Sequence, residues 1–65
     1  MTITLHSWFS GAWVVVVRWD KQFGFEWAAR PRQSSDYLKR RGCYASAEQA
    51  RAAARAWIRR EGRAM

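Results

Sequence analysis

The sequence has little of what small proteins use to reinforce a limited core. Its 65 residues include one cysteine, Cys43, and one histidine, His6. A single cysteine excludes a disulfide within the chain, and one Cys with one His falls short of a zinc site. We therefore expect no metal and no cofactor. A lone thiol is more typical of the reducing cytoplasm than of secreted proteins, so the expected location is cytoplasmic.

Long apolar runs are also missing. The longest unbroken one is Ala12–Val17, far shorter than the roughly 20 residues that a membrane helix needs. The first residues lack the basic start of a signal peptide. We expect a single small domain, 1–65, with no targeting segment and no membrane contact.

Acidic residues are few, and none forms a paired-carboxylate motif. The chain has five Asp and Glu against twelve Lys and Arg. His6 stands alone, Cys43 has no nearby histidine to activate it, and the single glycine of "QFGF" does not make a phosphate-binding loop. Cys43 is expected to be a buried, inert thiol. The sequence therefore indicates no enzyme and no small-molecule substrate.

Aromatic and β-branched residues are abundant in the first half. Three runs of them, separated by short turns, predict strands at about 2–9, 13–19 and 24–30. Gly24 is suited to the positive φ of the second turn. The spacing of the runs predicts an antiparallel meander. Pro31 ends the third strand, and the basic segment 31–45 stays open: a loop, a short helical turn or a fourth edge strand.

The last part of the chain predicts one helix, at 47–61. Ser46 and Gln49 have the spacing of a capping box, and Gly62 is a suitable stop. One side of this helix is mostly alanine, which allows close approach to a sheet whose large side chains are Trp and Phe. The expected fold class is α+β: a three-stranded antiparallel β-meander with one C-terminal helix packed on one face.

The run "WVVVVRW" at 13–19 is apolar on both of its faces. We expect the alternate set to face the helix: Trp13, Val15, Val17 and Trp19. One helix covers one face, so a candidate apolar interface remains on the other. It is made of Val14 and Val16 with either Trp8 or Phe9, of which we take Trp8 as the candidate. Three alternatives remain open for it: coverage by the N-terminal segment or by 32–42, a second copy of the chain, or another partner.

The net positive charge comes entirely from the second half of the chain. Residues 1–29 have two basic and two acidic residues, whereas residues 30–65 have ten basic and three acidic. Arginine binds phosphates in bidentate fashion, and aromatic side chains stack on bases. We therefore predict a surface for nucleic acid or a nucleoprotein. Its candidate residues are Arg30, Arg32, Lys39, Arg40, Arg41, Arg51, Arg55 and Arg59.

The run "CYASAEQARAAARAW" after three predicted strands resembles the small arm-type DNA-binding domains of tyrosine recombinases, which have an AP2-like fold. The matching positions are Tyr44, Ser46, Glu48, Ala50 and Trp57. The resemblance implies that the sheet enters the DNA major groove while the helix backs it. The chain departs from that pattern because its basic residues lie mainly after the predicted sheet.

By size and architecture the chain also resembles phage anti-CRISPR proteins, which are small α/β inhibitors that block a host defence complex. This resemblance implies a phage or mobile-element origin and a host protein as the partner. Trp and Arg are frequent in interface hot spots. The two functional hypotheses are therefore nucleic-acid binding and inhibition by protein–protein contact.

Overall fold

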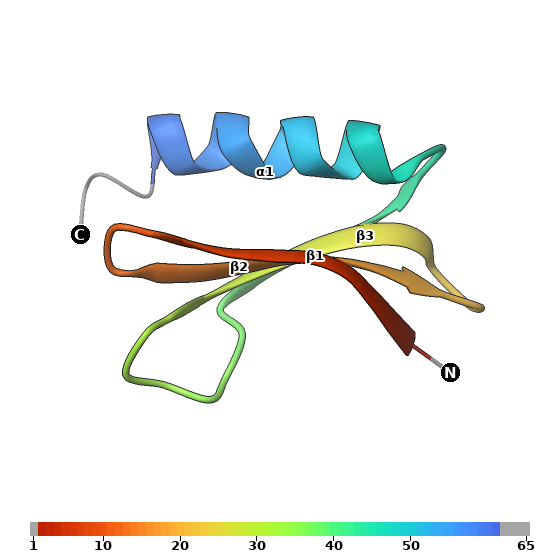
Figure 1. The fold of residues 1–65 in the computed structure, drawn as a ribbon. Coiled ribbons are helices and arrows are strands. Elements are labelled where there is room, and N and C mark those ends of the chain that lie inside the picture. The colour runs from red at the N-terminus through yellow and green to blue at the C-terminus, as the bar shows by residue number, and fades with distance from the viewer. Residues whose placement is uncertain (1, 62–65) are drawn as a thin grey trace.

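The protein is a four-stranded antiparallel sheet with one helix lying across one of its faces (Figure 1). The computed structural model describes residues 2–61. The elements are β1 (Thr2–Ser10), β2 (Trp13–Asp20), β3 (Gly24–Pro31), β4 (Lys39–Tyr44) and α1 (Ala47–Arg60). The strands lie in the order β1-β2-β3-β4. The α+β class and the C-terminal helix are confirmed, but the expected three-stranded sheet is wrong because a fourth strand joins it.

The fourth strand is the sheet edge made of "KRRGCY". It pairs with β3 from Ala29↔Lys39 to Phe25↔Tyr44, with a bulge between these ends. Its charges and its glycine are poor strand formers, so pairing with β3 rather than local propensity determines this strand. A charged edge strand also discourages pairing with other chains. The prediction for Cys43 is wrong: it lies in the bulge, exposed, with a left-handed φ of 67°.

Local signals explain the remaining elements. The Ser46 side chain accepts a hydrogen bond from the Gln49 backbone N–H at 3.2 Å, so the predicted N-cap is confirmed. The helix ends one residue before the predicted bound, with Glu61 as its C-cap; the predicted stop at Gly62 lies outside the described residues. Gly24 has the expected positive φ of 70° in the β2–β3 turn.

The core lies between α1 and the two central strands. Val15 and Val17 of β2 are fully buried against Ala50 and Ala54 of the helix. The Trp57 ring meets the Trp13 ring edge to face, with 5.0 Å between centroids. The small helix residues and large sheet residues therefore interlock as predicted. Trp19 is only half-buried and does not belong to this cluster.

The segment between β3 and β4 loops beneath the sheet in Figure 1, and its Tyr37 covers part of the other face. Arg18 and Arg30 both contact the Tyr37 ring, at 5.0 and 5.9 Å from its centroid. In the register, the pair Val16↔Ala28 lies between these two arginines, and both residues of the pair are buried.

The expected apolar interface is consequently not exposed. Val14 and Val16 are 9% and 6% exposed within the chain itself. Trp8 packs with the core on the helix side, and it is Phe9 that shares the far face with Val14. Of the alternatives left open, coverage by residues between 32 and 42 is the one that the structure shows.

Candidate nucleic-acid interface

The eight basic residues predicted to bind nucleic acid do not form one surface. Alternation along β4 sends Arg40 to the far face, whereas Lys39 and Arg41 line a groove on the helix side. Arg30 and Arg32 interact with residues of the far face. The last group, Arg51, Arg55 and Arg59, follows an outer flank of α1, where Arg55 and Arg59 also line a hollow with Trp8 and Ser10 of β1. The sheet thus divides the set into a far-face group of three and a helix-side group of five.

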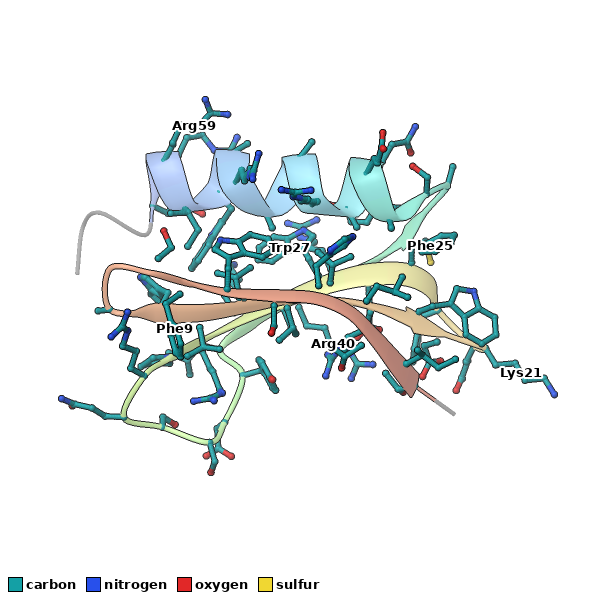
Figure 2. The ribbon with its side chains drawn as sticks, viewed as in Figure 1. Phe9, Lys21, Phe25, Trp27, Arg40 and Arg59 are labelled. Carbon is teal, nitrogen blue, oxygen red and sulfur yellow. The ribbon has the colours of Figure 1, made fainter. Side chains whose placement is uncertain are left out.

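The far-face group is engaged in contacts within the chain. Arg40 donates hydrogen bonds to both carboxylate oxygens of Glu26 at 2.9–3.2 Å, and Arg18 forms an ion pair with the same carboxylate at 2.6 Å. The Glu26 side chain is 1% exposed. A buried carboxylate needs such partners because an isolated buried charge is very costly. Arg40 therefore stabilises the fold in addition to any role at the surface, and Figure 2 shows it on the side of the sheet away from α1.

Electrostatics around this ion pair follow from the contacts. The Glu26 carboxylate raises the pKa of the Arg40 guanidinium, because its hydrogen bonds favour the charged form. On the same face, Arg30 donates to the Ser34 carbonyl at 2.6 Å and so holds the loop. Arg32 lies over the Phe9 ring, 4.4 Å from its centroid. Each of these three cations therefore makes a contact with a residue of the far face or of the loop that covers part of it.

Among residues 2–61, the helix-side group has no carboxylate partner of this kind. Arg51, Arg55 and Arg59 occur at intervals of four residues, so they share one side of α1 over about 12 Å of helix axis. They line a shallow hollow together with Glu48 and Ala52. Within residues 2–61, none of the three is in an ion pair. Figure 2 shows Arg59 extending from α1 away from the sheet.

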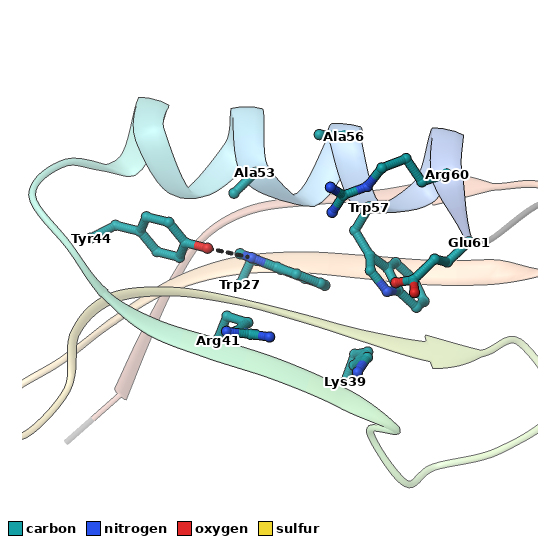
Figure 3. A pocket seen from close by; sticks show the side chains of 9 residues that line it. All are labelled: Trp27, Lys39, Arg41, Tyr44, Ala53, Ala56, Trp57, Arg60 and Glu61. Atoms are coloured by element: carbon teal, nitrogen blue, oxygen red, sulfur yellow. Dashed lines mark hydrogen bonds between the residues drawn. The ribbon is translucent and has the colours of Figure 1, made fainter.

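A deeper groove of about 660 Å³ separates β4 from α1 (Figure 3). Its cations are Lys39 and Arg41 from the strand and Arg60 from the helix. Its aromatic residues are Trp27, Tyr44 and Trp57. Glu61 is the single acid among the nine lining residues.

Sequence reasoning missed Arg60 and the aromatic wall of this groove. The spacing of Ala53, Ala56, Trp57 and Arg60 along the helix already places them on one flank. The sequence could not show which β4 side chains face the helix, because a fourth strand was only one of three alternatives left open for this segment. Once β4 is assigned, Lys39 and Arg41 must lie on the same face as Trp27, to which Arg41 is paired.

Two features are absent from the part of the chain that the structure describes: a cluster of metal-ligating side chains and a membrane-spanning helix. No group of three or more His, Cys, Asp or Glu side chains there could hold a metal ion. His6 lies exposed on β1. Among residues 2–61, no helix has the length and apolar character to cross a membrane.

Comparisons with known proteins give no relative to reason from. No protein-family model, curated protein or solved structure matches the chain.

Proposed function

We propose that the protein is a non-enzymatic binding protein that engages nucleic acid, or a nucleoprotein, through its helix side. The observation that carries this proposal is the division of the cations. Far-face Arg18, Arg30 and Arg40 are held by contacts within the chain. On the helix side, by contrast, six cations form no ion pair with any residue between 2 and 61. They are Lys39, Arg41, Arg51, Arg55, Arg59 and Arg60.

Unpaired arginines on a rigid helix are suited to phosphate binding. Each phosphate contact releases condensed counterions, which drives binding and makes it dependent on salt. The 12 Å span of the arginines on α1 matches the axial rise of about three to four base pairs. Contacts of this kind position a protein on a strand and carry no base information, so the proposed binding has little sequence preference.

This mode differs from that of the recombinase domains that the chain resembles. In those domains the sheet face opposite the helix meets DNA. In this protein that face is occupied by the loop carrying Tyr37, and its cations are turned to Glu26 and Ser34. The proposed interface is therefore the helix and the β4 edge.

The proposal is tested by fluorescence anisotropy with labelled DNA and RNA at about 50 and 200 mM salt, the range in which phosphate-driven binding weakens steeply. Arg55→Glu is expected to weaken binding to all sequences alike. Arg32→Glu is the matched control, since it makes the same charge change at an exposed site on the far face. Equal losses for both variants, or binding that does not vary with salt, would contradict the proposal.

Inhibition of a host protein is the second candidate function, and exposed apolar side chains on β1 favour it. Phe9 is 67% exposed, and Ile3 and Leu5 are also exposed. None of the five tryptophans is exposed. Phe9 therefore takes the place of the tryptophan that we expected to contribute most to binding the partner. Under this function Phe9→Ala abolishes capture of the partner and Arg55→Glu changes little. The opposite pattern supports nucleic-acid binding.

A further inference from the structure

We propose that the groove between β4 and α1 is a phosphate-binding site. Its occupant is the phosphate of a nucleotide, either free or within a strand. The inference deepens the proposed function and rests on it in part, because the groove cations Lys39, Arg41 and Arg60 belong to the interface proposed there. The groove shares no lining residue with the hollow of Arg51, Arg55 and Arg59.

The first argument is an unsatisfied donor. The Trp57 side chain is buried, and its indole N–H has no hydrogen-bond acceptor among the described residues. Buried polar groups are nearly always paired, so an exception requires an explanation. Trp57 lines the groove, where Figure 3 shows its ring hanging from α1 above β4. Because the nitrogen itself is buried, an acceptor bound in the groove satisfies it once the side chains that cover the nitrogen move aside.

The second argument is the balance of donors and acceptors. The Trp27 indole N–H donates to the Tyr44 hydroxyl oxygen at 3.1 Å, so the Tyr44 proton is directed elsewhere. Lys39, Arg41 and Arg60 have side chains that only donate. The groove therefore offers many donors, and a ligand that fits must be rich in acceptors. A phosphate has several acceptor oxygens and no need of a donor.

The third argument concerns charge. Three cations outnumber the one carboxylate, that of Glu61, so the groove attracts an anion. Glu61 and the negative end of the helix dipole oppose this attraction. Neither Glu61 nor the helix dipole removes this attraction, because each contributes at most one unit of negative charge against three positive charges. Replacing Glu61 by Gln is accordingly expected to tighten phosphate binding.

The groove is about the size of sites that bind small molecules. Such sites have volumes of roughly 300–1,000 Å³, with apolar walls and a few converging polar groups. At about 660 Å³, with indole and phenol walls, this groove falls within that range. The hollow on the outer side of α1 has only Ala52 as an apolar lining residue, so it lacks aromatic walls of this kind.

The test follows the indole N–H signals of the ¹⁵N-labelled protein by NMR while inorganic phosphate is added, with chloride at matched ionic strength as the control. The Trp57 signal is identified by its loss in Trp57→Phe. We expect phosphate to shift it saturably and chloride to leave it unmoved. No saturable shift, or an equal shift with chloride, overturns the proposal.

Variants separate this site from general electrostatics. Arg41→Gln and Arg60→Gln are expected to weaken phosphate binding at least several-fold, whereas Arg32→Gln, on the far face, leaves it unchanged. Both Arg41 and Arg60 are exposed, so these variants should fold. Equal weakening by all three variants would refute a localised site. Glu61→Gln should move the affinity in the opposite direction.

The source of the phosphate is identified by two further titrations. An oligonucleotide without a terminal phosphate shifts Trp57 only if the groove accepts a phosphate of the strand itself. A mononucleotide shifts it only if a free or terminal phosphate enters. A phosphate shift without salt-dependent DNA or RNA binding would retain this site and reject the proposed function; the reverse result would reject this site alone.

Discussion

The ion pair beneath the β3–β4 edge allows one stability effect to be worked out in detail. Glu26→Gln keeps the size of the side chain but removes its charge. The Arg18 side chain, 16% exposed, then loses its carboxylate partner. Breaking a buried ion pair costs about 3–5 kcal/mol, whereas an exposed pair contributes about 0–1 kcal/mol. Because Arg40 is half-exposed, we place the loss near the lower value, about 3 kcal/mol.

That loss is large for a chain of this length. At roughly 0.05–0.15 kcal/mol per residue, 65 residues have a free energy of unfolding of about 3–10 kcal/mol. A loss of about 3 kcal/mol lowers the melting temperature of a domain this size by roughly 12–24 °C. Thermal and urea unfolding followed by circular dichroism would measure both quantities.

The matched control is Glu48→Gln, an exposed acid in the first turn of α1. It should lose only the helix-dipole contribution of about 0.3–1 kcal/mol. A Glu26→Gln protein whose free energy of unfolding lies within about 1 kcal/mol of the wild-type value would refute the reasoning. The mostly buried Arg18 side chain would then have lost its carboxylate partner at too small a cost in stability. Replacing Arg18, Glu26 and Arg40 together by apolar residues should restore most of the stability.

Three other predictions follow. Hydrogen bonds from the Thr2 hydroxyl and two backbone N–H groups lower the pKa of Asp20. The contribution of Asp20 to stability is therefore complete above about pH 5 and disappears as the pH falls through the lowered pKa. Asp20→Asn should remove that part of the pH dependence of urea unfolding. Cys43→Gly should raise the urea midpoint slightly, because glycine relieves a left-handed strain of about 1–2 kcal/mol, and a lower midpoint would contradict this explanation. A homodimer would form through β1, because this edge strand is neutral and exposed. Sedimentation should then show that Leu5→Lys disrupts the dimer while Leu38→Lys does not. An equal effect of both variants would exclude the β1 edge as the dimer interface.

Much of the fold could be predicted because its signals are local. Ser46 and Gln49 begin the helix by hydrogen bonds between near neighbours, and the alanine-rich run that follows has high helix propensity. The first three strands have β-branched and aromatic residues in runs bounded by turns. The sequence favoured Val15 and Val17 as the residues that face the helix but did not fix this choice, because both faces of their strand are apolar.

The fourth strand and the far face depend on contacts that are distant in sequence. "KRRG" has no strand preference of its own, and β3 supplies its hydrogen-bonding partners. The role of Glu26 requires both the pairing Arg18↔Glu26 and the position of Arg40 across a bulged strand pair. Neither can be seen in a one-dimensional pattern.

The same limit applies to the predicted binding residues. A charge count treats all cations alike, whereas the structure separates those that bind within the chain from those that face outward. Arg40 and Arg41 are adjacent in sequence, yet one pairs with a buried acid and the other lines a groove. Alternation in β4 produces this difference.

The central claim is that unpaired arginines on α1 bind phosphates, and its most direct test is the salt dependence of binding. Three phosphate contacts contribute a slope of about −2.7 in log affinity against log salt, which is a loss of about 40-fold between 50 and 200 mM. Replacing Arg51, Arg55 and Arg59 by Gln should reduce the magnitude of the slope by about that amount, while a control with Lys21 and Arg32 replaced by Gln keeps the wild-type slope. Unchanged slopes in the helix variant would contradict the account.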